Sequence, residues 1–215
     1  YKVYEPFIRK IAGFGIASLE KDKERYEHKY EYCDLLVTGS GPAGLSSAYA
    51  AAKNGAKVIL AEDKPRFGGS LLTDDVTIDN LSGKAWTDKI ITQLKEMPNV
   101  IVKNRSQVFG YYDHNMTVMI ERTGDHLKDK PKYVPRQRLW YIRAKEVILS
   151  TGSIERPIVF GNNDTPGVFL SAAAKEYIKV YGVLVGKKPL IFTNNDSGYE
   201  TALEFKKHGI DPIIL

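Results

Sequence analysis

The residues best placed to do chemistry are the glycines of one short loop and an acid that follows them. Residues 35–44 read LLVTGSGPAG, an apolar β-type run that breaks into a GxGxxG pattern. Glu62 follows a second apolar run, VILA, 18 residues after the last glycine. Such a loop can hold a diphosphate on its backbone N–H groups, while the acid accepts hydrogen bonds from an adenosine ribose. The spacing therefore predicts a dinucleotide-binding site.

Each glycine of the loop has its own role in this prediction. Gly39 permits the tight turn from strand to helix, Gly41 lacks the Cβ that would hold a pyrophosphate away, and Gly44 lets the helix lie close to the strand. We expect that helix from Ala43 to Asn54, with its N-terminal N–H groups and positive dipole end facing the phosphates. Because the carboxylate of Glu62 repels a 2′-phosphate, NADP is the disfavoured ligand.

A second flexible turn follows the acid. Asp63 and Lys64 lead into the sequence PRFGGS, in which Gly69 and Ser70 can bring backbone and a hydroxyl close to the cofactor. The alternative is a βαβ unit that keeps its glycines for packing and binds nothing. The second turn argues against that alternative.

The elements around the loop predict a doubly wound α/β fold with a parallel, Rossmann-like sheet. Residues 57–61 and 99–103 are expected to be parallel strands, and a crossover helix is expected over residues 80–98. Together with the strand before the glycine loop, they form the half-domain of a dinucleotide-binding protein.

An antiparallel β-meander is expected next in the chain, over about residues 107–145, where apolar and polar residues alternate. Residues 145–149 then return as another parallel strand. That strand ends in a turn of small residues, so Thr151 and Gly152 are expected beside the cofactor site.

The end of the chain repeats the order of its first motif. Residues 188–215 contain a strand, a loop, a helix and a second strand, but Asn194, Asn195 and Asp196 largely replace the loop glycines. A second dinucleotide site there is expected to be degenerate. The apolar run at the end and the missing initial Met suggest a piece of a longer chain. We therefore expect three parts: an N-terminal tether (1–31), a first dinucleotide-binding domain (32–155) and the start of a second, degenerate unit (156–215).

Composition narrows the alternatives. The 215 residues, 43% hydrophobic and 27% charged, suit one large or one and a half globular domains. No apolar run approaches the ~18 residues that span a bilayer, and no signal peptide is evident, so a cytoplasmic protein without membrane contact is expected. The net charge of +5 comes from scattered basic residues, which argues against nucleic-acid binding.

Other reactive side chains offer little chemistry. The single cysteine, Cys33, excludes an intrachain disulfide and a CxxC motif, and we expect it to be buried. The four histidines have no metal-ligand spacing, so no metal site is predicted, and no catalytic residue can be named. Glu155 and Arg156 are expected to form a supporting ion pair.

At the level of longer motifs, the chain resembles the α subunits of heterotetrameric sarcosine oxidases, within the flavoproteins that have two dinucleotide-binding domains. The resemblance rests on YEPFIRKIAGFG, CDLLVTGSGPAGL, FGGSLL, RLWYIRAKEVILSTGSIERPIVFGNND and FTNND. The segments RLWxIRAK and IERPIVFxNND are not demanded by the fold, which makes the resemblance specific. Opine- and amino-acid-oxidising subunits share the general plan.

The resemblance implies a multisubunit flavoenzyme that demethylates sarcosine oxidatively to glycine, forms hydrogen peroxide and passes the one-carbon unit to tetrahydrofolate. The α subunit of this family holds NAD, while FAD and the amine substrate lie on the β subunit and covalent FMN lies near the interface. The expected partners are the β, γ and δ subunits. Cofactor binding without catalysis is therefore implied for this chain.

The resemblance also implies which residues contact NAD. They are the glycine loop with Ala43, the acidic segment after the second strand, the second turn and the start of the meander: Gly39, Gly41, Gly44, Glu62, Asp63, Lys64, Ser70 and Val108. In this scheme Glu62 binds the ribose hydroxyls, Ser70 donates a hydroxyl, and the Val108 backbone meets the adenine edge. Val108 is otherwise an ordinary strand residue.

Two further functions stay open at this stage. The first is an FAD-binding enzyme of the reductase type or part of an opine or amino-acid oxidase. The reductase type needs a CxxC pair or another electron acceptor, which one cysteine cannot supply. The second is a structural scaffold that assembles a multisubunit enzyme and binds no cofactor.

Overall fold

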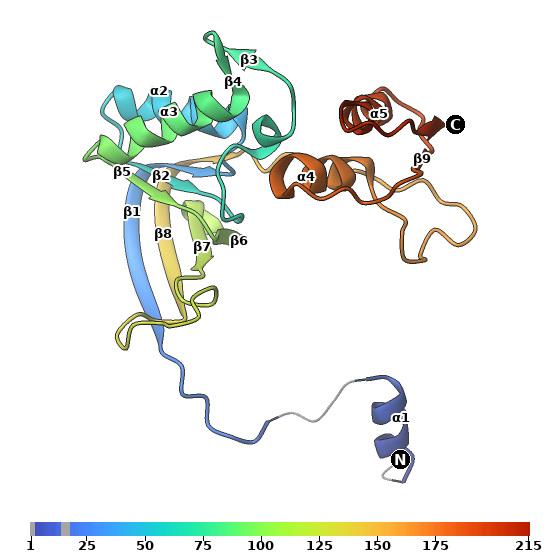
Figure 1. Cartoon of the computed structure of the whole chain (residues 1–215). Helices are drawn as coiled ribbons and strands as arrows, with labels where there is room; N and C mark the ends of the chain where they lie inside the picture. Colours follow the sequence, from blue (N-terminus) through green and yellow to red (C-terminus); the bar gives the residue numbers. More distant parts are fainter. Residues whose placement is uncertain (1–2, 14–17) are drawn as a thin grey trace.

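The structure, a computed structural model, describes residues 3–13 and 18–215 and is built on a mixed sheet of six strands (Figure 1). The strands lie in the order β5-β2-β1-β8-β7-β6. Their bounds are β1 Tyr26–Thr38, β2 Val58–Ala61, β5 Val100–Lys103, β6 Ser106–Tyr112, β7 Met116–Glu121 and β8 Gln137–Leu149.

The parallel half of this sheet carries two helices on one face. β1 pairs in parallel with β2 and β8, and β2 pairs in parallel with β5. Helices α2 (Pro42–Lys53) and α3 (Gly83–Glu96) connect successive parallel strands, as crossover connections do. The α/β fold with a Rossmann-like parallel sheet, predicted from the sequence, is confirmed.

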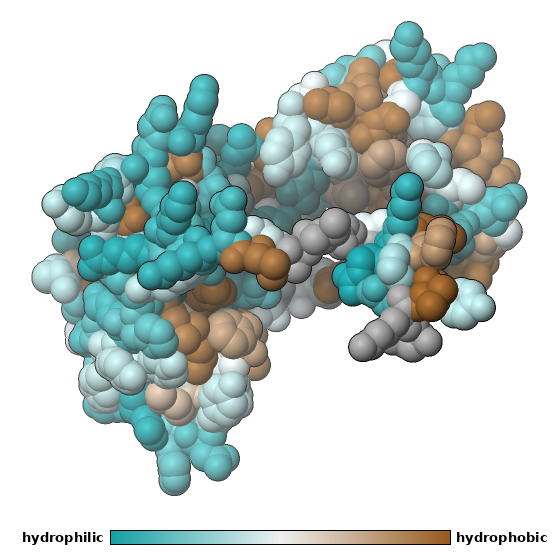
Figure 2. All heavy atoms as spheres, turned by 90° about the horizontal axis from the view of Figure 1, so that it is seen from below, coloured by the Kyte–Doolittle hydropathy of each residue, from teal (hydrophilic) through white to brown (hydrophobic). Residues whose placement is uncertain are grey.

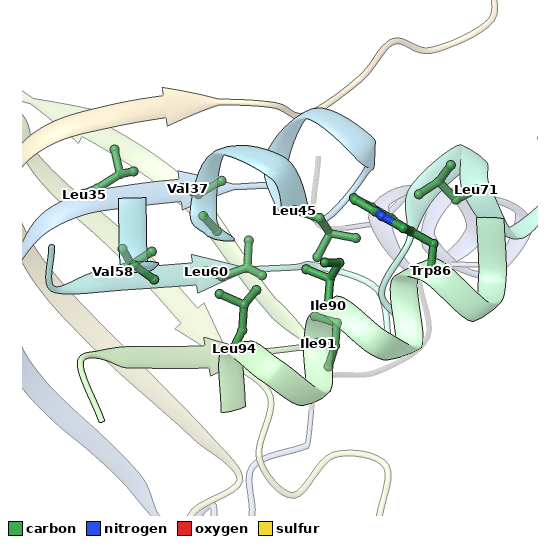
Figure 3. Close-up of a cluster of buried hydrophobic side chains, with 12 residues drawn as sticks. Leu35, Val37, Leu45, Val58, Leu60, Leu71, Trp86, Ile90, Ile91 and Leu94 are labelled. Carbon is green, nitrogen blue, oxygen red and sulfur yellow. The ribbon is translucent and has the colours of Figure 1, made fainter. Parts of the chain in front are cut away.

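The main hydrophobic core lies between these strands and the two helices (Figure 3). Strand residues such as Val37 and Leu60 meet Leu45 of α2 and Ile90 and Leu94 of α3, and all five are at least nine-tenths buried. Burial of each such aliphatic side chain contributes roughly 1.5–3 kcal/mol. The core therefore holds the end of β1, and the loop that follows it, firmly against α2.

The crossover helix begins later than its sequence pattern predicts. Residues 80–82 belong to a short hairpin, β3 (Thr77–Ile78) and β4 (Leu81–Ser82), because Asp79 and Asn80 turn the chain with φ of 49° and 62°. Helix α3 then begins at Gly83, where the Ser82 hydroxyl accepts a hydrogen bond from the Ala85 N–H at 3.3 Å.

The antiparallel half of the sheet is continuous with the parallel half. β7 pairs antiparallel with both β6 and β8, as the predicted meander requires. The predicted break at residue 145 is wrong, because β8 runs without interruption from Gln137 to Leu149. It pairs with β1 from Tyr26↔Gln137 to Thr38↔Leu149. The strand is long because β1 supplies a partner along its whole length.

A smaller unit follows the six-stranded sheet. It contains helix α4 (Ser171–Tyr181) and the parallel strands β9 (Leu190–Ile191) and β10 (Ile213–Ile214), which are joined by helix α5 (Ser197–Lys207). The strand–helix–strand order predicted near the end of the chain is present. Figure 2 shows hydrophobic surface gathered on this unit, where exposed large side chains include Val159, Phe160, Leu190 and Phe192.

The N-terminal segment contains one short helix, α1 (Glu5–Ile11), none of whose residues is buried. Residues 1–2 and 14–17 of the predicted tether lie outside the described residues. β1 begins at Tyr26, inside the range predicted for the tether, and the division into three parts stays a prediction. Within the described part of the chain, no helix is both long and apolar enough to cross a bilayer.

Candidate dinucleotide-binding site

The glycine loop lies between the end of β1 and the start of α2, and two of its glycines are required by close packing. Gly39 has φ of 97°, and a Cβ there would lie 2.3 Å from the backbone oxygen of Ser150. A Cβ on Gly44 would lie 1.9 Å from the backbone oxygen of Gly39. The predicted roles of these two residues, a tight turn and a close helix, match their surroundings.

Gly41 differs because a side chain there would point into open space. A Cβ on this residue would have no heavy atom within 4 Å. The residue is the N-cap of α2, and no side chain caps this end of the helix. The first N–H groups of α2, including that of the exposed Ala43, have no partner within the helix, and the dipole is positive there. This cradle fits the diphosphate of a dinucleotide.

Glu62 faces this loop from the end of β2. Its Oε2 accepts hydrogen bonds from the Ser40 N–H at 2.9 Å and from the Ser40 hydroxyl at 2.5 Å. Its Oε1 accepts from the Lys64 N–H at 2.9 Å. Burial, followed by the neighbouring Asp63, raises the pKa of Glu62 above its ordinary value. A carboxylate in this position can accept a hydrogen bond from a ribose hydroxyl.

The second turn packs directly against the glycine loop. The Gly68 N–H donates to the backbone oxygen of Ser40 at 3.1 Å and lies 3.2 Å from its hydroxyl. Gly69 has φ of +54°, and a Cβ there would come within 3.0 Å of the Gly41 Cα. Ser70 follows at the exposed start of a 3-10 helix, Gly69–Leu72. The turn thus brings Gly69 and Ser70 beside the loop, as the sequence predicts.

The turn after β8 also lies against the loop. The Ser150 hydroxyl donates to the backbone oxygens of Thr38 at 2.8 Å and Gly39 at 3.0 Å. Thr151 and Gly152 come next and are exposed. A Cβ on Gly39 would lie 3.3 Å from the Thr151 Cα, and contact of Thr151 and Gly152 with a cofactor stays a prediction.

Two other predicted contact residues, Asp63 and Val108, lie on the segments next to Glu62. β6 begins next to Glu62, because the Ser106 N–H donates to the Glu62 backbone oxygen at 2.7 Å. Val108 is two residues further along β6 and half-buried. The Asp63 carbonyl accepts from Arg122 at 2.7 Å, so its main chain is tied to the sheet.

Lys64 turns its charged end toward the smaller unit. Its Nζ contacts both carboxylate oxygens of Glu176, on α4, at 3.0 and 3.1 Å. Arg66 also reaches this helix, since its guanidinium donates to the Val180 carbonyl at 2.8 Å. The loop after Glu62 is therefore braced by α4, and Lys64 touches Glu62 through its backbone N–H.

Three residues of the site were not expected from the sequence: Ser40, Thr38 and Glu176. Ser40 is fully buried and joins the loop, the acid and the second turn. The Thr38 hydroxyl is buried without a hydrogen-bond partner among the described residues, one residue before the loop. A hydroxyl between the first two glycines is the only signal that could have indicated Ser40, while Glu176 is 112 residues from its partner.

The secondary expectations have mixed outcomes. Cys33 is buried, as predicted, and burial raises the pKa of its thiol to about 12. Glu155 does not pair with Arg156; its carboxylate instead accepts from the Ser171 and Ala172 N–H groups at the start of α4, at 3.3 and 2.8 Å. Glu155 caps α4 instead of pairing with Arg156 because the first N–H groups of the helix have no hydrogen-bond partner within the helix. The described residues contain no group of three or more potential metal ligands.

Comparison with known proteins agrees with this geometry. Residues 34–116 match the family model described as FAD dependent oxidoreductase. Over 214 residues the chain is 44% identical to the alpha subunit of sarcosine oxidase from Rhizobium meliloti, covering 100% of this chain and 22% of the relative. It is 38% identical to the alpha subunit of sarcosine oxidase from Corynebacterium sp., covering 93% and 21%. The chain thus spans about a fifth of the length of these relatives.

More distant proteins are similar to this chain in sequence or in structure. An opine oxidase chain from Agrobacterium tumefaciens is 26% identical over 75% of this chain and 33% of its own length. The solved structure of an L-proline dehydrogenase from P. horikoshii has a TM-score of 0.71 at 24% identity, covering 92% of this chain and 37% of that one. A flavoprotein disulfide reductase from Escherichia coli has a TM-score of 0.56 at 20% identity, covering 86% and 42%. The chain therefore shares its fold with these two solved oxidoreductase structures.

Proposed function

Because the chain is related along its whole length to sarcosine oxidase α subunits, we propose that it is the NAD-binding portion of such a subunit. The observation that carries the proposal is the meeting of two features at one edge of the sheet. An uncapped helix start opens onto the empty space beside Gly41, and the Glu62 carboxylate faces the same loop. The first suits a diphosphate and the second suits a ribose.

The whole enzyme would hold NAD here while it oxidises sarcosine to glycine, with molecular oxygen reduced to hydrogen peroxide and tetrahydrofolate as acceptor of the one-carbon unit. The partner subunits would carry FAD, FMN and the amine substrate. This chain's own residues would bind and orient the dinucleotide. The loop amides would hold its diphosphate, and Glu62 would orient the adenosine ribose.

A specific observation favours FAD as the second candidate ligand. The family model that matches residues 34–116 is described as FAD dependent oxidoreductase. Both dinucleotides contain the same ADP portion, so the loop and Glu62 would serve either one. The disulfide-reductase version of this alternative lacks its redox pair, because the chain has one cysteine and it is buried.

The test is calorimetric titration of the purified protein with NAD, FAD, NADP and ADP-ribose in separate experiments. We expect NAD and ADP-ribose to bind, and NADP to bind at least about tenfold more weakly because its 2′-phosphate meets the Glu62 carboxylate. Tight retention of FAD with a yellow colour would favour the second candidate. If none of the four ligands releases or absorbs heat, the result would contradict the proposal and favour a structural scaffold that binds no cofactor.

A Glu62→Gln variant provides the matched control for the NADP result. The change removes the negative charge and keeps the size of the side chain. If charge repulsion causes the discrimination, the ratio of NADP to NAD affinity rises toward one in the variant. An unchanged ratio would assign the discrimination to another group.

A further inference from the structure

The Ser40 hydroxyl connects three segments that meet at the candidate site. It donates to Glu62 Oε2 at 2.5 Å and lies 3.2 Å from the Gly68 N–H of the second turn. The residue is completely buried. A serine at this position is not required by the loop itself, because the backbone N–H that also contacts Glu62 would be present in any residue except proline.

The hydrogen bonds leave a limited set of acceptor directions on Glu62. An ionised carboxylate offers about four lone-pair directions. Ser40 occupies two of them on Oε2, through its N–H and its hydroxyl, and the Lys64 N–H occupies one on Oε1. The remaining direction is on Oε1, near the Asp63 carboxyl group, which raises the pKa of Glu62. Three donors thus hold Glu62 in one orientation, with one acceptor direction left on Oε1.

We propose that Ser40 is a positioning residue, which fixes the Glu62 carboxylate so that its Oε1 is presented to one hydroxyl of the adenosine ribose. The inference rests on the proposed function, since it assigns the means by which the dinucleotide site selects its ribose. Ser40 acts through Glu62. Its own hydroxyl is fully engaged by Glu62 and the second turn.

The charges around Glu62 determine how the site responds to pH. Asp63 is the adjacent carboxyl group and raises the pKa of Glu62, in the same direction as burial, which is the larger cause. The hydrogen bonds from Ser40 act in the opposite direction by stabilising the ionised form. Lys64 directs its charge toward Glu176, and Arg122 contacts the backbone of Asp63, so neither cation forms an ion pair with Glu62.

Removal of the hydroxyl therefore has two expected effects. Ser40→Ala loses a hydrogen bond to a charged group, so ADP-ribose and NAD should bind about tenfold more weakly at pH 7. Glu62 should also retain its proton to a higher pH, which moves the acid-side loss of affinity upward by about one pH unit. Titration of the purified protein with ADP-ribose between about pH 5 and 9 measures both effects.

A double-mutant cycle separates positioning through Glu62 from a general effect on folding. In a Glu62→Gln background there is no carboxylate to titrate, so adding Ser40→Ala should change the affinity less than about twofold. Ser47→Ala is the matched control, because it removes another hydroxyl bond near the loop, to the Ala43 carbonyl at 2.8 Å, and does not touch Glu62. Its pH profile should equal that of the unmodified protein.

The outcomes distinguish this inference from the proposed function. An unmodified protein that binds ADP-ribose, together with a Ser40→Ala variant of the same affinity and pH profile, would overturn the inference alone. An equal cost of Ser40→Ala in both backgrounds would also overturn it. If the unmodified protein binds no dinucleotide at any pH, both the inference about Ser40 and the proposed function are wrong. Should Ser40→Ala fail to fold, Ser40→Cys, with its weaker S–H donor, should show a smaller shift in the same direction, and no shift would contradict the inference.

Discussion

The chain contains two strand–loop–helix units that can be compared position by position. With Gly44 aligned to Gly198, Gly39 corresponds to Thr193 and Gly41 corresponds to Asn195. The packing glycine is kept in both units. A Cβ on Gly198 would lie 2.6 Å from the Thr193 side chain, as one on Gly44 would collide with the first loop.

The units differ in what faces the start of the helix. The first N–H groups of α2 meet open space beside Gly41. At the start of α5, the Asn195 side-chain oxygen accepts hydrogen bonds from the Ser197 N–H at 3.0 Å and the Ser197 hydroxyl at 2.5 Å. The second loop thus supplies its own hydrogen-bond acceptor where the first leaves room for a ligand. The two loops therefore differ at this position, which is open space beside Gly41 in the first and holds a hydrogen-bonded Asn195 side chain in the second.

The largest expected effect tests the shared packing. Gly44→Ala places a Cβ against the backbone of Gly39, which cannot rotate away, so we expect a loss of about 3 kcal/mol in the free energy of unfolding. Gly198→Ala makes a less severe contact, 2.6 Å from the Thr193 Cβ against 1.9 Å at Gly44, and we expect a smaller loss of about 1 kcal/mol. Urea denaturation of both variants measures the difference. Equal losses would break the comparison.

The next prediction isolates the open space at Gly41. Gly41→Ala adds a methyl group where no atom lies within 4 Å, so the free energy of unfolding should change by less than about 0.5 kcal/mol. The same methyl group would hold a diphosphate away from the loop amides, so NAD or FAD should bind at least about tenfold more weakly. Denaturation and calorimetry of one protein sample check both parts. Unchanged affinity would mean that the ligand does not approach this position.

The hydrogen bonds from Ser197 to Asn195 in the second unit give a smaller effect. Asn195→Ala removes the acceptor of two Ser197 hydrogen bonds, and we expect a loss of about 1 kcal/mol in the free energy of unfolding. Asn194→Ala is the comparison variant, because it removes only the oxygen that accepts from the Asn195 Nδ2 at 3.1 Å and leaves both Ser197 hydrogen bonds in place. Thermal unfolding of the two variants measures both losses. An equal loss from Asn194→Ala would mean that the Ser197 hydrogen bonds do not explain the effect of Asn195→Ala.

The buried carboxyl group of Glu62, in the first unit, makes a contribution to the free energy of unfolding that depends on pH. Because burial raises the pKa of Glu62, the folded state holds its proton more tightly than the unfolded state. Its contribution to stability therefore declines as pH rises from the ordinary glutamate pKa through the raised one. In the absence of ligand, the difference in free energy of unfolding between Glu62→Gln and the unmodified protein should shift in favour of the variant as pH rises through this range. Parallel pH curves would contradict the raised pKa.

The smallest effect concerns the hydroxyl of Thr38. It is buried without a hydrogen-bond partner among the described residues, so Thr38→Val removes a polar atom at no cost in internal hydrogen bonds. We expect the free energy of unfolding to stay within about 0.5 kcal/mol or to rise slightly. A loss above about 1 kcal/mol in urea denaturation would reveal an ordered water molecule on this hydroxyl.

The sequence was sufficient for features that depend on neighbouring residues. The glycine loop, the helix from Pro42 to Lys53 and the parallel strand at Val58–Ala61 follow from local spacing and from runs of apolar residues. The hairpin before α3 was missed because its turn uses Asp79 and Asn80 at positive φ, without the glycine that usually marks such a turn.

Features that depend on distant residues could not be predicted. The pairing of Lys64 with Glu176 joins residues 112 positions apart. The continuity of β8 depends on a long β1, and the sequence around residue 145 gives no sign of it. The orientation of Glu62 depends on Ser40, whose hydroxyl could equally have faced solvent. In each case the deciding partner lies on another element.

The long pairing of β1 with β8 has a consequence for the dynamics of the protein. The two strands stay in register over 13 residues each, which extends about 40 Å from the glycine loop to the opposite rim of the sheet. Amide hydrogens in the middle of this ladder can reach solvent only when the sheet itself opens, so deuterium should enter there last. A pull along the strands from the far rim would load these hydrogen bonds in shear, so many of them would have to break together before the strands could slide past each other.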